Sequence, residues 1–129
     1  ICRTKGNKNT HIILRGGKDG PNYFEQNLDK LEEDMNLRDI NMGYIVDCSH
    51  GNSSKDYHNQ PKVLDYLINQ KYNNSREKLV GIMLESNIKE GKQKTLPKNE
   101  LKYGISITDS CLSFCETQDL INNYFMSLS

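Results

Sequence analysis

Hydrophobic residues gather in three short runs along the chain, at positions 11–15, 42–47 and 78–85. Each run is continuous rather than alternating, is rich in β-branched side chains and is flanked by turn-forming residues. Continuous apolar runs of this length are typical of strands buried on both faces, as the strands of parallel sheets are. We therefore predict three parallel strands at these positions.

The segments between these runs, and the segment near the C-terminus, have the hydrophobic period of helices. The apolar positions are Leu28, Leu31 and Met35 in the first segment, Val63, Leu64, Leu67 and Ile68 in the second, and Leu120, Ile121, Tyr124, Phe125 and Leu128 in the third. Alternation of strands and helices predicts an α/β fold with a parallel sheet and right-handed crossovers. An irregular loop is expected at 86–108, before the last helix.

The length of 129 residues suits one domain, or a portion of a larger one. Its 17 basic and 17 acidic residues balance, which argues against a nucleic-acid-binding surface spread over the whole molecule. No apolar run is long enough to cross a membrane, and no signal peptide is recognisable. The four cysteines indicate free thiols, as in cytoplasmic proteins, rather than a disulfide framework.

Polar residues that could carry chemistry follow each predicted strand: Arg15, His50 and Glu85. They are spaced at equal intervals, 35 residues from 15 to 50 and 35 from 50 to 85. This interval is close to one βα unit of a (β/α)₈ barrel, in which roughly 250 residues form eight units. Active sites of such barrels lie at the carboxyl ends of the strands, so we expect these three side chains to lie together at that end of the barrel.

Each candidate has a structural alternative. His50 lies in a polar stretch that could simply cap the following helix, or it could be a metal ligand. Glu85 could form a structural ion pair or ligate the same metal, and periodicity alone makes Asp109 a helix N-cap. Together, His50, Glu85 and Asp109 would form a mixed nitrogen and oxygen site suited to manganese, iron or a similar ion. Arg15, followed by two glycines, suits a phosphate or carboxylate, or else a salt bridge at the barrel end.

Several longer strings make the sequence more specific. They are HIILRGGK at 11–18, PNY at 21–23, DCSHGNSSK at 47–55, GIMLES at 81–86, EG at 90–91 and YGISITDSC at 103–111. In this order and at these separations, they resemble the C-terminal part of the class I 3-deoxy-D-arabino-heptulosonate-7-phosphate (DAHP) synthases. The resemblance covers nearly the whole chain. The related 3-deoxy-octulosonate 8-phosphate synthases match less well, because they lack the strings around His50 and Asp109 in combination.

The resemblance implies a (β/α)₈ barrel enzyme that condenses phosphoenolpyruvate with erythrose 4-phosphate, the first step of aromatic amino acid biosynthesis. It implies a divalent metal (manganese, iron, cobalt or zinc) held by His50, Glu85, Asp109 and a cysteine. It also implies that His50 is catalytic, that Arg15 contacts phosphoenolpyruvate and that Asp109 borders the substrate. The parent enzyme is expected to be an oligomer, with no nucleic-acid or membrane partner.

Parts of the family pattern have no counterpart in this sequence. The metal-binding cysteine of the family belongs to an early strand without a match here, and Cys48 stands where an aromatic residue is usual. The Lys-Pro-Arg-Thr motif that grips erythrose 4-phosphate is also missing. We therefore interpret residues 1–129 as the last three βα units of one barrel domain, and expect the isolated chain to be inactive. The alternative is a non-catalytic truncated remnant, or an assembly partner that needs another polypeptide to close the barrel.

Overall fold

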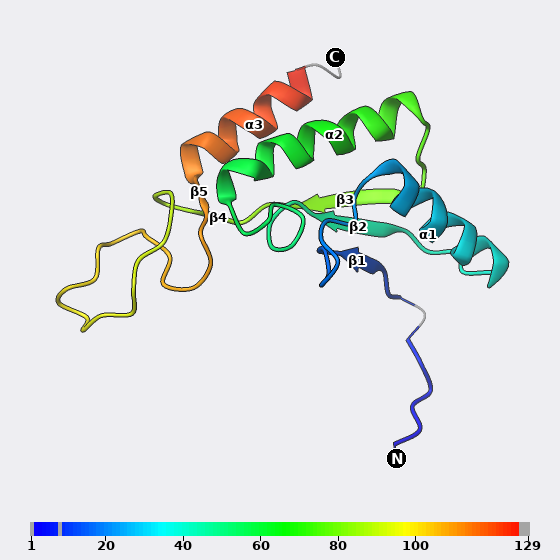
Figure 1. Cartoon of the computed structure of the whole chain (residues 1–129), viewed down its shortest axis with the longest axis horizontal. Helices are drawn as coiled ribbons and strands as arrows, with labels where there is room; N and C mark the ends of the chain where they lie inside the picture. The colour runs from blue at the N-terminus through cyan, green and yellow to red at the C-terminus, as the bar shows by residue number, and fades with distance from the viewer. Residues whose placement is uncertain (1, 8, 127–129) are drawn as a thin grey trace.

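The computed structural model describes residues 2–7 and 9–126. Its centre is a parallel sheet of three strands in the order β1 (Ile12–Leu14), β2 (Tyr44–Asp47) and β3 (Leu79–Met83). Helix α1 (Glu25–Leu37) connects β1 to β2, and α2 (Gln60–Asn73), preceded by a 3₁₀ turn at Tyr57–Asn59, connects β2 to β3 (Figure 1). Because each strand returns to the sheet through a helix, all three carboxyl ends lie at the same edge.

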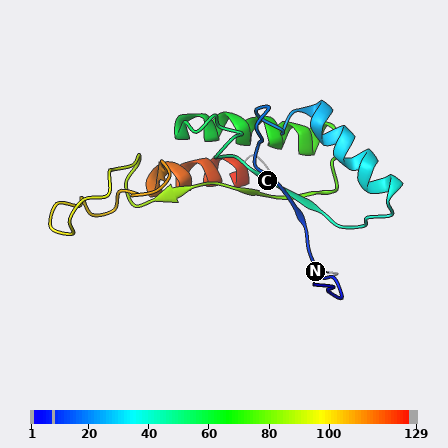
Figure 2. The same ribbon diagram turned by 60° about the horizontal axis from the view of Figure 1, so that its bottom comes forward.

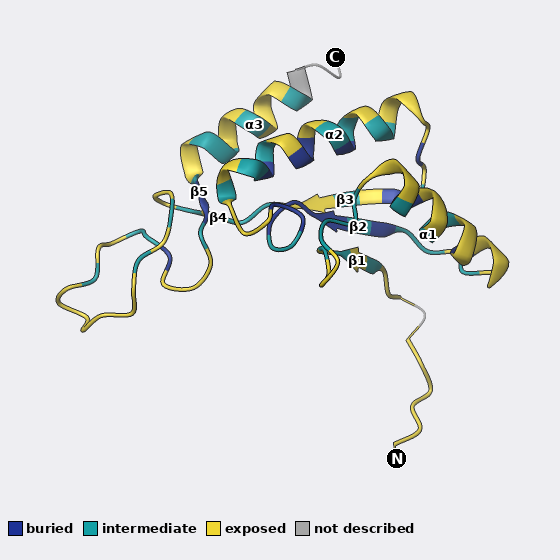
Figure 3. Cartoon of the chain, viewed as in Figure 1, coloured by how far each residue is buried: buried dark blue, intermediate teal, exposed yellow. Residues whose placement is uncertain are grey.

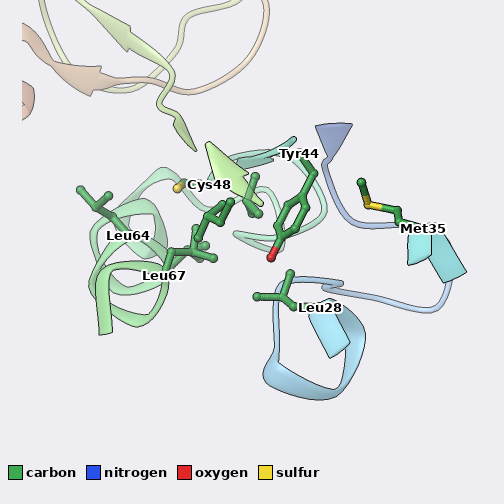
Figure 4. Packing of buried hydrophobic residues seen from close by; sticks show 9 residues of the cluster. Leu28, Met35, Tyr44, Cys48, Leu64 and Leu67 are labelled. Atoms are coloured by element: carbon green, nitrogen blue, oxygen red, sulfur yellow. The ribbon is translucent and has the colours of Figure 1, made fainter. Parts of the chain in front are cut away.

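Both connecting helices pack on the same face of the sheet (Figures 1 and 2). Their apolar stripes meet β2 around Tyr44, which is completely buried. The Tyr44 hydroxyl donates a hydrogen bond to Glu32 Oε1 at 2.6 Å, so the polar end of this buried side chain has a partner. The other large side chains of this core, shown in Figure 4, are Leu28 and Met35 of α1, Leu64 and Leu67 of α2, and Cys48.

The middle strand is the most deeply buried, whereas β3 is buried at Leu79 and more exposed beyond it (Figure 3). Val46 of β2 is fully buried, but Val80 of β3 is 61% exposed and Met83 is 42% exposed. On β1, Ile13 is 46% exposed. Within the described residues, β1 and β3 each pair with one neighbour only, so the sheet has two open edges.

Beyond β3 the chain forms a long excursion and returns. Strand β4 (Ser86–Asn87) pairs in parallel with β5 (Leu112–Ser113), and the segment 88–111 between them projects away from the sheet (Figure 1). The Gln93 side chain stabilises this excursion by hydrogen bonds to the backbone of Lys102 and Ile105. Helix α3 (Phe114–Met126) follows β5, and its Leu120 and Tyr124 pack against the core.

The predicted α/β class and parallel sheet are confirmed, and the three strands and three helices lie where the hydrophobic pattern indicates them. The prediction of an irregular loop at 86–108 is wrong in part, because β4 falls within it and pairs with β5. Leu128 lies outside the described residues. Among those that are described, no helix combines the length and hydrophobicity needed to span a bilayer.

Candidate active site

The carboxyl ends of the three strands open into one cavity of about 370 Å³. Position 15 follows β1, the segment 49–51 follows β2, and position 85 follows β3. The charged and ionisable residues that line the cavity are Arg15, His50, Lys55, Glu85, Lys92 and Asp109. The structure therefore brings all four site residues expected from the sequence to the same cavity.

His50 lies in a tight turn directly after β2. Its backbone adopts the left-handed conformation, with φ of 48°, which is uncommon for a residue with a side chain. The turn is held by Asp47, whose Oδ1 accepts a hydrogen bond from the Ser49 amide at 2.8 Å. The other oxygen of Asp47, Oδ2, lies 2.7 Å from His50 Nδ1. The second ring nitrogen, Nε2, therefore faces the cavity.

Glu85 approaches His50 from the end of β3. Its Oε1 lies 3.5 Å from His50 Nε2, and its Oε2 accepts a hydrogen bond from Ser49 Oγ at 2.7 Å. The backbone of Glu85 is fixed as well, because the buried side-chain amide of Gln60 accepts from its N–H at 2.8 Å and donates to its carbonyl at 3.2 Å. One carboxylate oxygen is thus engaged by Ser49, and the other points at the imidazole.

Asp109 comes from the far end of the excursion. Its Oδ2 lies 3.7 Å from His50 Nε2, and its side chain is 64% exposed. The chain returns there because the amide of Leu112 donates to the carbonyl of Glu85 at 2.9 Å, while Gly91 and Cys111 exchange two backbone hydrogen bonds. This pairing brings Asp109, which is 24 residues after Glu85 in the sequence, back beside Glu85.

The donor set of these three residues fits a divalent metal ion. One ligand atom each from His50, Glu85 and Asp109 can be chosen so that all lie within 4.8 Å of one another. When His50 is neutral with its proton on Nδ1, Nε2 and both carboxylates present electron pairs to the same space, an arrangement that a cation stabilises. One imidazole and two carboxylates suit a borderline ion such as manganese, iron, cobalt or zinc.

Three basic residues, Arg15, Lys55 and Lys92, also line the cavity. These charges suit an anionic substrate, since guanidinium and ammonium groups bind phosphate and carboxylate. The loops that carry Arg15 and His50 are in direct backbone contact, because the Gly51 amide donates to the Arg15 carbonyl at 3.0 Å. Residues suited to a cation and residues suited to an anion therefore line one cavity.

Sequence reasoning did not single out Asp47, Ser49 or Gln60, which orient the histidine and the glutamate. Asp47 and Ser49 could have been noted as polar residues at the end of a buried strand, whereas nothing in the pattern distinguishes Gln60 from an ordinary first-turn helix residue. Cys48 does not belong to the candidate metal site of His50, Glu85 and Asp109. Its side chain is fully buried in the core, and this burial raises the pKa of the thiol to about 12.

Fold and cavity together define an α/β protein with a candidate metal site at the carboxyl ends of parallel strands. Comparison with known proteins gives the family. The sequence model of the DAHP synthetase I family matches residues 1–122, and the chain belongs to that family.

Relatives named phospho-2-dehydro-3-deoxyheptonate aldolase support this assignment. The Tyr-sensitive protein of Salmonella typhimurium is 42% identical over 130 residues, covering 100% of this chain and 36% of that protein. The tyrosine-inhibited protein of Schizosaccharomyces pombe is 43% identical over 127 residues, covering 95% of this chain and 34% of that protein. The solved structure of the aldolase from Francisella tularensis superimposes with a TM-score of 0.83 at 42% identity, covering 92% of this chain and 34% of the other. The chain thus spans about a third of the length of these relatives.

Proposed function

We propose that the chain supplies part of the active site of a DAHP synthase, which condenses phosphoenolpyruvate with erythrose 4-phosphate. The observation that carries this proposal is the convergence of His50, Glu85 and Asp109 beside Arg15 in one cavity. The family assignment supplies the reaction. A metal site alone, or an anion site alone, would not favour this activity. The two together match a metal-dependent reaction between two phosphorylated substrates.

Each residue has a separate role in this proposal. His50, Glu85 and Asp109 hold the metal, with a cysteine from another part of the longer protein as the fourth ligand. The bound metal supplies Lewis-acid polarisation of the aldehyde carbonyl. Arg15 binds the phosphate of phosphoenolpyruvate and neutralises part of its charge. Asp109, the most exposed of the three ligands, also borders the substrate.

We further propose that the chain forms the last three βα units of a (β/α)₈ barrel in an oligomeric, cytoplasmic enzyme. The parallel order β1-β2-β3, the two open edges of the described sheet and the share of about a third of the relatives' length support three units of an incomplete barrel, wherever in the barrel they fall. The four free cysteines are compatible with a reducing compartment. Sequencing of the coding region upstream of Ile1 should reveal five further βα units. Finding those units downstream of Ser129 instead would contradict the C-terminal placement.

A second candidate function is that of a non-catalytic remnant or assembly partner. The exposed edge strand β3, with Val80 61% exposed, favours this candidate because another polypeptide could cover it. The two candidates differ in one measurable respect. A remnant has no requirement for a working His50, whereas a part of an enzyme has.

A chimera separates the two. In the Salmonella aldolase, the segment that matches this chain is replaced by residues 1–129, and consumption of phosphoenolpyruvate is followed with erythrose 4-phosphate and manganese. The chimera should be active, and His50→Ala should lower its rate by about 100-fold or more. His58→Ala, which changes an exposed histidine outside the cavity, serves as the matched control and should retain the rate. A folded chimera that is inactive, or one that tolerates His50→Ala, would contradict the proposal.

A further inference from the structure

Asp47 is the most deeply buried acidic residue next to the cavity, and both its carboxylate oxygens and its backbone carbonyl have polar partners. Its side chain is 4% exposed at the carboxyl end of the middle strand. Oδ1 accepts from the Ser49 amide at 2.8 Å, and its backbone carbonyl accepts from Asn52 Nδ2 at 2.8 Å. Oδ2 lies 2.7 Å from His50 Nδ1. Both carboxylate oxygens therefore contact the turn that follows β2, one at the Ser49 amide and one at the His50 ring.

We propose that Asp47 is the positioning residue of this site, which fixes the proton of His50 on Nδ1 and aims Nε2 as a ligand for a divalent cation. The inference rests on the proposed function of the cavity. An ionised carboxylate only accepts hydrogen bonds, so the ring nitrogen that faces it must carry the proton. The lone pair then resides on Nε2, which faces Glu85 Oε1 at 3.5 Å and Asp109 Oδ2 at 3.7 Å.

A purely structural role would require only one of the two carboxylate oxygens. The contact from Oδ1 to the Ser49 amide is sufficient to hold the turn. Asp56 illustrates that simpler case, because its Oδ1 accepts from the backbone N–H of His58, two residues later, at 3.1 Å. In Asp47 the second oxygen, Oδ2, contacts the imidazole ring of His50. Carboxylate–histidine pairs of this kind fix the tautomer and raise the basicity of the ligating nitrogen.

The first test uses the metal-free chain of 129 residues and needs no activity. Two-bond ¹⁵N–¹H correlation spectra at alkaline pH distinguish a protonated from an unprotonated nitrogen in each imidazole ring. His50 should be the Nδ1–H tautomer, with His11 and His58 as internal references because both are exposed. An Nε2–H tautomer at His50 in the unmodified chain would overturn the inference, whatever the variants do.

The second test is Asp47→Asn, with Asp56→Asn as the matched control. An amide has one acceptor oxygen, but both the Ser49 amide and the ring N–H of His50 need an acceptor there. We expect the Nε2–H tautomer of His50 to become populated and manganese affinity, measured by electron paramagnetic resonance, to fall by about 10–100-fold. Asp56→Asn should alter neither. A folded Asp47→Asn variant that keeps the Nδ1–H tautomer and full manganese affinity would refute the inference.

These readouts separate the positioning role from the proposed function. If the unmodified chain binds no manganese but His50 shows the Nδ1–H tautomer, the three residues of this chain do not suffice for a metal site, while the role of Asp47 in setting the tautomer stands. If manganese binds and the tautomer is Nε2–H, the positioning role fails alone. If the Asp47→Asn variant does not fold, as a loss of dispersion in its amide spectrum would show, the tautomer of His50 in the unmodified chain alone decides the positioning role of Asp47.

Discussion

Gly16 is the position where a single added methyl group should do the most damage to the candidate site. Its φ is +77°, and a Cβ built there would lie 2.5 Å from the carbonyl carbon of Gly51 and 2.7 Å from the amide nitrogen of Asn52. Those atoms belong to backbone, so they cannot move aside as a flexible side chain does. The left-handed conformation costs roughly 1–2 kcal/mol for a residue other than glycine. Overpacking of this kind adds about 1–3 kcal/mol.

Gly16→Ala should therefore lower the free energy of unfolding by roughly 2–5 kcal/mol, against a typical total of about 5–15 kcal/mol. It should also separate Arg15 from the turn that carries His50, because the hydrogen bond from Gly51 to the Arg15 carbonyl spans the same contact. Urea denaturation followed by circular dichroism measures the change in stability.

Gly17→Ala is the matched control for this substitution. A Cβ at Gly17 has no atom within 4 Å, and the backbone there is not left-handed. Its stability should stay within about 0.5 kcal/mol of the unmodified chain, as for most surface substitutions. Equal losses at the two glycines would refute the reasoning, since they would show that the close backbone approach at Gly16 is not what matters.

Two further predictions concern buried groups around the site. Gln60→Met should cost about 1–3 kcal/mol, because it leaves the backbone N–H of Glu85 without its partner, whereas Gln26→Met on the exposed face of α1 should cost little in the same denaturation assay. Equal costs would contradict the bracing role of Gln60. Burial raises the pKa of the Cys48 thiol from 9.0 to about 12, so an alkylating reagent should modify exposed Cys115 in the native chain and reach Cys48 only after unfolding. Because the folded state holds this proton more tightly, the stability linked to Cys48 is fully present below pH 9.0 and is lost as the pH rises toward about 12. Rapid modification of native Cys48, detected by mass spectrometry, would contradict its placement in the core.

The strands and helices could be predicted because burial imposes a pattern on the sequence. Tyr44 and Val46 of the middle strand are fully buried in the core under the helices, and the apolar run from Tyr44 to Val46 made this strand recognisable in the sequence. The same reasoning could not find β4 and β5, because two-residue strands are too short to show a period. Their pairing is fixed instead by the return of a long excursion, a contact between residues far apart in the sequence.

Some residues of the candidate site could be predicted from the sequence more readily than others. Arg15, His50 and Glu85 follow strands, so topology alone brings them together. Asp109 does not follow one of the three strands, so its carboxylate chemistry and the resemblance to a family, rather than topology, connected it with the others. The supporting residue Asp47 was overlooked because a polar residue after a strand looks the same whether it closes a turn or orients a neighbouring ring.

The central claim is that His50, Glu85 and Asp109 form one metal site at the carboxyl ends of the strands. Substoichiometric manganese, added to the ¹⁵N-labelled chain, broadens the amide resonances nearest to the bound ion. We expect broadening to begin in three separate segments at once, around 49–51, 85–86 and 109–110, and we expect His50→Ala to abolish this pattern. Broadening centred on α1, where Asp29, Glu33 and Asp34 are exposed, or spread evenly over the chain, would contradict the claim.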